Sequence, residues 1–157
     1  MLLEEGLAEY IQKAVGNETN QNYDIVFHKH VKAFIAYGKV IPLQRLLVDD
    51  FLEVVTNPQD GNPDDKNYEQ TFRIWMYYTQ AASFVTFLVE QYGWGKLEKC
   101  FYEEDLHAAF YNNYNKTLEQ LESEWHHYVE NDVLSYSTSE LNHPIVRNIN
   151  YYLPKIN

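Results

Sequence analysis

The sequence contains a single cysteine, Cys100, among its 157 residues. An intrachain disulfide and a zinc site built from several cysteines are therefore both excluded. Long apolar runs are missing as well, so we expect no membrane span. Glu4 and Glu5 interrupt the one apolar start that could act as a signal peptide. None of these absences indicates a compartment, and the localisation stays unknown from the sequence.

Positive charge is also scarce. The chain has 12 Lys and Arg residues against 23 Asp and Glu residues, which gives a formal net charge of -11. A nucleic-acid-binding protein shows a basic patch or stripe, and binding to anionic lipid needs clustered basic residues. The composition therefore argues against nucleic acid as a partner and against docking on an anionic membrane surface.

Apolar and aromatic residues make up 45% and 16% of the chain, which is enough for one domain with a core of its own. Apolar residues recur at helical spacing, and no segment gives a convincing strand pattern. We therefore predict an all-α fold, a compact bundle of about six or seven helices. The helical domain is expected over residues 1–132, followed by an irregular tail over 133–157 that packs through Ile145, Val146 and Tyr151 or belongs to a further element.

The strongest predicted helix covers residues 68–92 and is apolar on nearly every face from Phe72 to Leu88, as expected of a buried central helix. Gly93 should end it, and the small residues at 81–83 leave room for a close helix neighbour. The remaining predictions are helices over 2–14, 23–37, 95–103, 105–114 and 116–132, a short helix opened by Pro42, a turn around 49–55, and a loop over 56–67.

The opening segment EEGLAEY, residues 4–10, places two carboxylates on one helix face, because Glu5 and Glu9 are four residues apart. By spacing alone, such a pair is typical of a solvated acidic face. The wider pattern resembles the helix that carries the third zinc ligand in the gluzincin zinc peptidases, the group of thermolysin and the aminopeptidases. That resemblance implies that Glu5 is a zinc ligand and that Glu9 orients a ligating histidine through a hydrogen bond.

The segment YTQAASFVTFLVEQYG, residues 78–93, resembles a second motif of the same group, in the form found in bacterial peptidases described as MA-like. The motif begins at Tyr78. In relatives of the aminopeptidase type, a tyrosine at this place donates a hydrogen bond to the oxyanion of the tetrahedral intermediate, and a neutral hydroxyl donor suits that task. The resemblance implies this catalytic role for Tyr78. From the residues alone, Tyr78 is equally one of fourteen tyrosines that pack in the fold.

The resemblance runs from about Leu2 to Val129. Its last part is YNKTLEQLESEWHHYV, residues 114–129, which is similar to the closing helix of the MA-like group, where Trp125 and the leucines would fill the core. The family implies the fold of the C-terminal half of a thermolysin-like catalytic domain and a zinc cofactor. It also implies a peptide substrate and hydrolysis of the peptide bond by zinc-activated water.

The HExxH motif, which supplies two histidine ligands and the general base in that group, is missing from the sequence. In the family it lies shortly before the third-ligand helix, so we expect Met1 to stand inside a longer peptidase domain. The 157 residues by themselves are then expected to bind no zinc and to hydrolyse no peptide. We expect each histidine to be a surface or packing residue, namely His28, His30, His107, His126, His127 and His143.

A second interpretation stays open: a non-catalytic helical domain that kept a peptidase scaffold, lost the metal and binds other molecules. The burial of Leu2, Leu3 and Leu7 separates the two interpretations. Exposure of these side chains, or burial by a second chain, favours the truncated peptidase, whereas packing within one chain favours the self-contained module. An exposed N-terminal helix would also allow a homo-oligomer.

Overall fold

The computed structural model describes residues 2–15, 26–47 and 63–156. This part of the chain contains no strand, which confirms the all-α prediction. Eight of its elements are α-helices, one more than the upper end of the expected range. The elements are α1 (Leu2–Val15), α2 (Phe27–Ala36), α3 (Leu43–Leu46), α5 (Pro63–Tyr92), α6 (Trp94–Cys100), α7 (Leu106–Tyr114), α8 (Leu118–Asn131), α9 (Pro144–Tyr152) and the short 3₁₀ turns η2 (Glu140–Asn142) and η3 (Leu153–Lys155).

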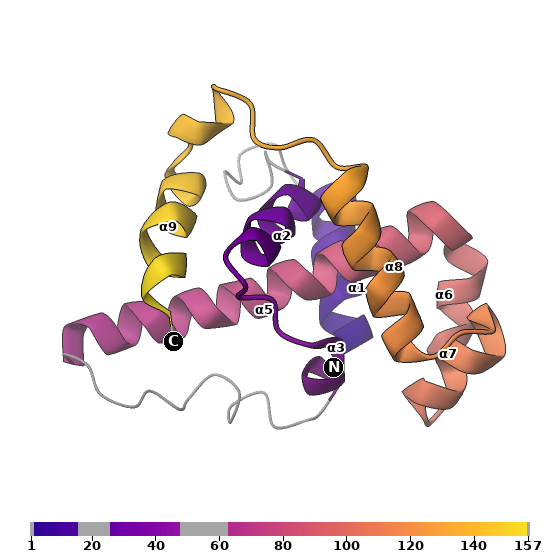
Figure 1. The fold of residues 1–157 in the computed structure, drawn as a ribbon. Coiled ribbons are helices and arrows are strands. Elements are labelled where there is room, and N and C mark those ends of the chain that lie inside the picture. Colours follow the sequence, from indigo (N-terminus) through magenta and orange to yellow (C-terminus); the bar gives the residue numbers. More distant parts are fainter. Residues whose placement is uncertain (1, 16–25, 48–62, 157) are drawn as a thin grey trace.

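Helix α5 runs across the molecule, and α1, α2 and α6 pack directly against it (Figure 1). Its 30 residues contain no Gly, and no Pro after the first position, so nothing interrupts the helix. Gly93 ends it as predicted and takes a φ of 85°, a conformation that a residue without a Cβ adopts easily. The start differs from the prediction, because α5 begins at Pro63 inside the predicted loop 56–67, and proline suits the first helical position.

Three of the predicted elements cannot be compared fully with the structure. The rest of the predicted loop, residues 56–62, and the predicted turn around 49–55 lie outside the described residues. So do residues 23–25 of the predicted second helix, whose described part begins at Phe27 and ends at Ala36. Among the helices of the described ranges, none has the length and apolar character that crossing a lipid bilayer requires.

The core is one cluster of buried apolar side chains along α5. Its fully buried members include Phe84 and Leu88 of α5, Leu2 of α1 and Trp125 of α8. The rings of Phe84 and Trp125 meet edge to face with centroids 5.6 Å apart. Burial of each such side chain stabilises the fold by about 1.5–3 kcal/mol, so these contacts fix how α1 and α8 lie on α5.

The segment 133–157 is not irregular throughout, because it contains helix α9. That helix begins at Pro144, after the N-cap residue His143, whose ring accepts a hydrogen bond from the backbone N–H of Ile145. The usual caps are Ser, Thr, Asp and Asn, so a histidine cap gives little warning of a helix in the sequence. Ile145 itself is half-buried.

The buried face of α9 also differs from the prediction. Val146 and Ile149 are fully buried, but Tyr151, which we expected to pack, is 58% exposed. The helical period explains this difference. Val146 and Ile149 are three residues apart and so share one face of α9, whereas Tyr151 lies two residues after Ile149 and falls on another face. The next residue, Tyr152, contacts Phe72 with ring centroids 5.2 Å apart, which places α9 on the first half of α5 (Figure 1).

Candidate functional site

Helices α1 and α5 pack tightly against each other at Gly6. A Cβ placed on Gly6 would lie 2.5 Å from the carbonyl oxygen of Ala81 and 2.7 Å from the Cγ2 atom of Val85. Both distances are far shorter than an ordinary van der Waals contact, so only a glycine allows this approach. Ala81 and Ala82 are fully buried, which confirms that the small residues of α5 admit a close helix neighbour.

This approach brings the three predicted site residues together. Glu5 directly precedes Gly6 on α1, and Tyr78 lies one turn before Ala81 on α5; Glu5, Glu9 and Tyr78 are all half-buried. Burial raises the pKa of Tyr78 above its usual value, and the negative charges of Glu5 and Glu9 raise it further. The direction of this shift agrees with the backbone contact between Gly6 and Ala81, which places Glu5 and Tyr78 on neighbouring turns of the two helices.

The chemistry of this cluster follows from the protonation of its members. Because its pKa is raised, the Tyr78 phenol keeps its proton at neutral pH and acts as a hydrogen-bond donor. Ionised carboxylates such as those of Glu5 and Glu9 accept hydrogen bonds and bind cations. The cluster therefore combines one neutral donor with two anionic acceptors at the junction of two helices.

A zinc centre is not complete in the described part of the chain. No group of three or more His, Cys, Asp and Glu side chains in residues 2–15, 26–47 and 63–156 is placed to hold a metal ion. A catalytic zinc takes three protein ligands and one water, so Glu5 and Glu9 alone do not fit one.

Known proteins do not identify the site. No protein-family model, curated protein or solved structure matches this chain. The resemblance to the gluzincins therefore rests on the sequence motifs around Glu5, Glu9 and Tyr78, and the roles of these residues stay predictions.

The apolar face of α1 is not exposed. Leu2 is 0% exposed and Leu3 is 2% exposed, and both belong to the core cluster of the same chain. Leu7 is half-buried. Leu2 and Leu3 are therefore covered within the chain rather than exposed, and a homo-oligomer through this helix stays a prediction. Of the two interpretations of the sequence, this packing favours the self-contained helical module.

Two histidines of α2 are buried, and as their spacing predicts they point to different partners. The Nδ1 atom of His28 lies 2.7 Å from the Oγ atom of Ser83, and its Nε2 atom lies 3.4 Å from a carboxylate oxygen of Glu90. Ser83 also accepts a hydrogen bond of 3.0 Å from the indole N–H of Trp125. The sequence gives no signal for this network, because its members come from three helices. Of the other four histidines, His107 and His127 are exposed, whereas His126 and His143 are half-buried.

The His28 ring faces two partners at once. Its Nδ1 atom shares a hydrogen bond with the Ser83 hydroxyl, and its Nε2 atom lies close to the Glu90 carboxylate, which can only accept hydrogen bonds. A serine, a histidine and a carboxylate in series are typical of a hydrolase nucleophile. Here Ser83 is 0% exposed and already binds Trp125, so the network joins α2, α5 and α8 rather than serving a reaction.

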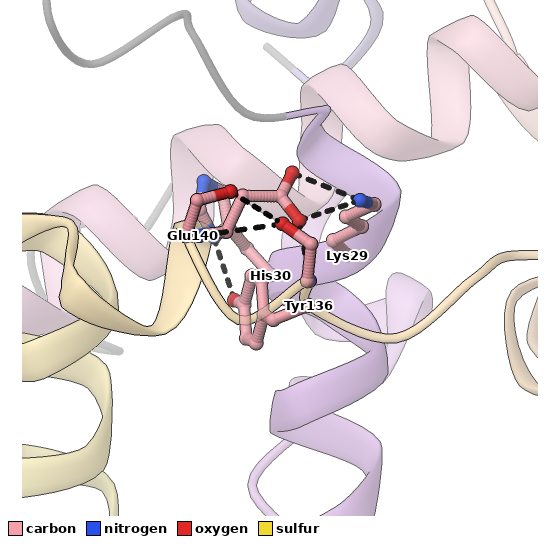
Figure 2. Close-up of polar contacts among 6 residues, drawn as sticks. Lys29, His30, Tyr136 and Glu140 are labelled. Carbon is pink, nitrogen blue, oxygen red and sulfur yellow. Dashed lines mark hydrogen bonds and ion pairs between the residues drawn. The ribbon is translucent and has the colours of Figure 1, made fainter.

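A second polar cluster holds the segment after α8 against α2 (Figure 2). The Nδ1 atom of His30 lies 2.8 Å from the Tyr136 hydroxyl, and the ammonium group of Lys29 lies 2.8 Å from both carboxylate oxygens of Glu140. The contact with Lys29 lowers the pKa of Glu140 to about 2, and burial lowers the pKa of His30 to about 3. His30 and Glu140 each have a hydrogen-bond partner within the fold, so we interpret the cluster as structural.

Proposed function

We propose that this chain is the helical C-terminal part of a gluzincin-type, MA-like zinc metallopeptidase, which hydrolyses peptide bonds. In this proposal Glu5 is the third zinc ligand, Glu9 orients a ligating histidine, and Tyr78 donates a hydrogen bond to the oxyanion. The observation that supports it best is that two motifs far apart in the sequence bring Glu5, Glu9 and Tyr78 together across the α1–α5 contact.

The burial of the two carboxylates also supports the proposal. A solvated acidic face would turn its carboxylates to water, as Glu4 does on the same helix. Glu5 and Glu9 are instead half-buried beside Tyr78. Removing a carboxylate from water costs free energy unless a partner compensates it, so this placement indicates a use for the charge beyond solubility.

The remaining parts of the proposed centre come from outside this sequence. The two histidine ligands and the general base would be supplied by an HExxH segment, which these 157 residues do not contain. The chain alone is therefore expected to show no peptidase activity, because Glu5 by itself does not hold a catalytic zinc.

The first experiment reads the coding DNA directly upstream of the Met1 codon. An in-frame HExxH shortly before Glu5 supports the proposal, and the longer protein is then assayed for bound zinc and for peptide hydrolysis. A stop codon there, or a reading frame without HExxH, overturns the proposal.

Variants of the longer protein then test each role. Glu5→Gln should lose zinc, because an amide is a poorer ligand than a carboxylate. Glu4→Gln removes the same charge from an exposed neighbour and should keep zinc. Tyr78→Phe should keep zinc but lower kcat about 10²–10³-fold, the usual loss for one oxyanion donor. Full zinc content in Glu5→Gln would show that Glu5 is not a ligand.

The second candidate function is a non-catalytic helical module that binds other molecules. The observation that favours it is the burial of Leu2 and Leu3 within the single chain. This function predicts that no HExxH precedes Met1 in frame, and that the 157-residue chain unfolds in urea in one cooperative transition. A non-cooperative transition, with apolar surface that binds a hydrophobic dye in the native buffer, would count against it.

A further inference from the structure

An open cleft of about 460 Å³ lies where the last turns of α5 meet the second half of α8. This volume is in the range of small-molecule sites, about 300–1,000 Å³. Its lining includes three aromatic rings, those of Phe87, Tyr92 and Tyr128, and two carboxylates, those of Glu124 and Asp132. None of these residues belongs to the cluster around Glu5 and Tyr78.

The three rings form a connected aromatic surface. Phe87 is only 3% exposed and lies between the two tyrosines. Its ring centroid is 6.0 Å from that of Tyr92, with the planes at 84°, and 5.6 Å from that of Tyr128, with the planes at 43°. Rings tilted against one another in this way present electron-rich faces in more than one direction, which is how proteins surround an organic cation.

The charge of the cleft is negative. Glu124 and Tyr128 are four residues apart on α8 and so share one face of that helix, and Asp132 is the C-cap residue four positions further on. The Glu124 carboxylate is already paired with the ammonium group of Lys116. The Asp132 carboxylate makes no hydrogen bond or ion pair with any residue that the structure describes. Asp132 therefore offers an uncompensated negative charge beside the rings.

One of these rings already contacts cations of the chain itself. The ammonium groups of Lys116 and Lys96 lie 5.1 Å and 5.6 Å from the centroid of the Tyr92 ring. Both distances are within the roughly 6 Å at which an ammonium group is attracted to an aromatic face. The tyrosine hydroxyls are engaged elsewhere, since Tyr128 donates to Glu90 and Tyr92 donates to Glu124.

We propose that this cleft binds a small organic cation, an alkylammonium group that lies against the partly exposed ring of Tyr128, over the buried ring of Phe87, and takes Asp132 as its counter-charge. An anionic ligand would meet Asp132 and a protein of net charge -11, and a neutral ligand would gain nothing from the charge of the exposed Asp132. The site is independent of the proposed peptidase function, since it shares no residue with it.

The test titrates the purified 157-residue protein with choline by calorimetry and by ¹H–¹⁵N NMR. The matched neutral probe is 3,3-dimethyl-1-butanol, which has the shape of choline without its charge. We expect saturable choline binding that perturbs the signals of Phe87 and Tyr128, and binding of the neutral probe at least about fivefold weaker. No choline binding, or equal binding of both probes, overturns the proposal. A parallel titration with Nα-acetyl-lysine methylamide shows whether the cation can also be a lysine side chain of a peptide.

Variants then locate the site. Asp132→Asn should weaken choline binding about fivefold, and Tyr128→Leu should weaken it similarly, whereas Tyr128→Phe keeps the ring and should bind almost as well as the unchanged protein. Glu104→Gln removes one negative charge from an exposed position outside the cleft and is the control for net charge. Circular dichroism confirms that each variant is folded. Unchanged binding in both Asp132→Asn and Tyr128→Leu would show that choline binds elsewhere, which also overturns the proposal.

Discussion

Gly6 of α1 faces the backbone of Ala81 on α5, so closely that a methyl group on Gly6 would lie 2.5 Å from the Ala81 carbonyl oxygen. Gly6→Ala gains about 1 kcal/mol of helix propensity. Overpacking costs about 1–3 kcal/mol or more, and a clash with backbone cannot be relieved by turning a side chain. We expect Gly6→Ala to lower the free energy of unfolding by about 1–2 kcal/mol, measured by urea denaturation.

The matched control is Gly95→Ala on α6. A Cβ at Gly95 would meet no atom within 4 Å, so this substitution should gain the helix propensity without a clash. It should be neutral or stabilising by up to about 1 kcal/mol. Equal stability of the two alanine variants would show that α1 and α5 can separate at Gly6 without loss.

Ser83 joins two buried polar groups, the ring of His28 and the indole N–H of Trp125. Ser83→Ala removes the partner of the His28 Nδ1 atom and of the Trp125 indole N–H, and each orphaned polar atom costs about 1–3 kcal/mol. We expect a loss of about 2–4 kcal/mol in the free energy of unfolding, again from urea denaturation. Ser123→Ala on the exposed face of α8 should change it by less than about 0.5 kcal/mol. A loss equal to that of Ser123→Ala would mean that Ser83 does not hold the network together.

Helix α5 and the Ser83 network show what the sequence can and cannot predict for this fold. The helix over 68–92 and its end at Gly93 follow from local rules, namely apolar periodicity and the conformation of glycine, and the structure confirms both. The Ser83 network follows from no local rule, because α2, α5 and α8 each contribute to it. Helix α9 is hard to predict for a third reason, because its N-cap residue is a histidine.

The candidate site is an intermediate case. Periodicity places Glu5 and Glu9 on one helix face, but no spacing rule connects them to Tyr78, since the two helices are far apart in the sequence. The family motifs alone suggested that these residues act together. What brings them close is the contact at Gly6, whose physical requirement becomes visible only when the carbonyl of Ala81 is placed against it.

The proximity of Tyr78 to the two carboxylates can be measured on the chain as it stands. Because burial and then the charges of Glu5 and Glu9 raise the pKa of Tyr78, Glu5→Gln should move that pKa back toward the usual value for tyrosine. The measurement is an NMR titration of protein labelled with ¹³C in its tyrosine rings, with the Tyr78 signal assigned through Tyr78→Phe. The exposed Glu4→Gln variant should shift the pKa of Tyr78 less than Glu5→Gln does. Identical titration of Tyr78 in both variants would place Glu5 too far away to share its site.

Cys100 should react slowly with thiol reagents in the folded protein. Its side chain is fully buried, and burial raises the pKa of the thiol to about 11. The ordinary pKa is lower by about two units, so the thiolate, which is the reactive form, is about a hundredfold scarcer near neutral pH. We expect labelling by a disulfide reagent to be at least about a hundredfold slower in buffer than in strong denaturant. Equal rates would mean that α6 and α7 open readily around Cys100.

Acid should destabilise the fold through His30. Burial lowers the pKa of His30 to about 3, with the nearby positive charge of Lys13 as a further cause, whereas the unfolded chain has the ordinary value of about 6.5. The folded state therefore binds the additional proton of His30 less tightly than the unfolded chain does. The contribution of His30 to stability is complete above pH 6.5 and is lost as the pH falls from there toward 3. Between pH 7 and pH 5 the loss is about 2 kcal/mol.

The variant that isolates this effect is His30→Gln, since glutamine can still form a hydrogen bond with the Tyr136 hydroxyl but has no proton to gain. It should be less stable than the unchanged protein at pH 7, because the fit is poorer, yet lose about 2 kcal/mol less between pH 7 and pH 5. Glu140 hardly affects the comparison between pH 7 and pH 5. The pKa of its carboxyl is lowered to about 2, so its contribution to the free energy of unfolding begins to fall only below about pH 4.5. The free energy of unfolding is measured by urea denaturation at both pH values. If both proteins lose the same amount, His30 takes up its proton without leaving the fold, and Tyr136 or water must then stabilise the charged ring.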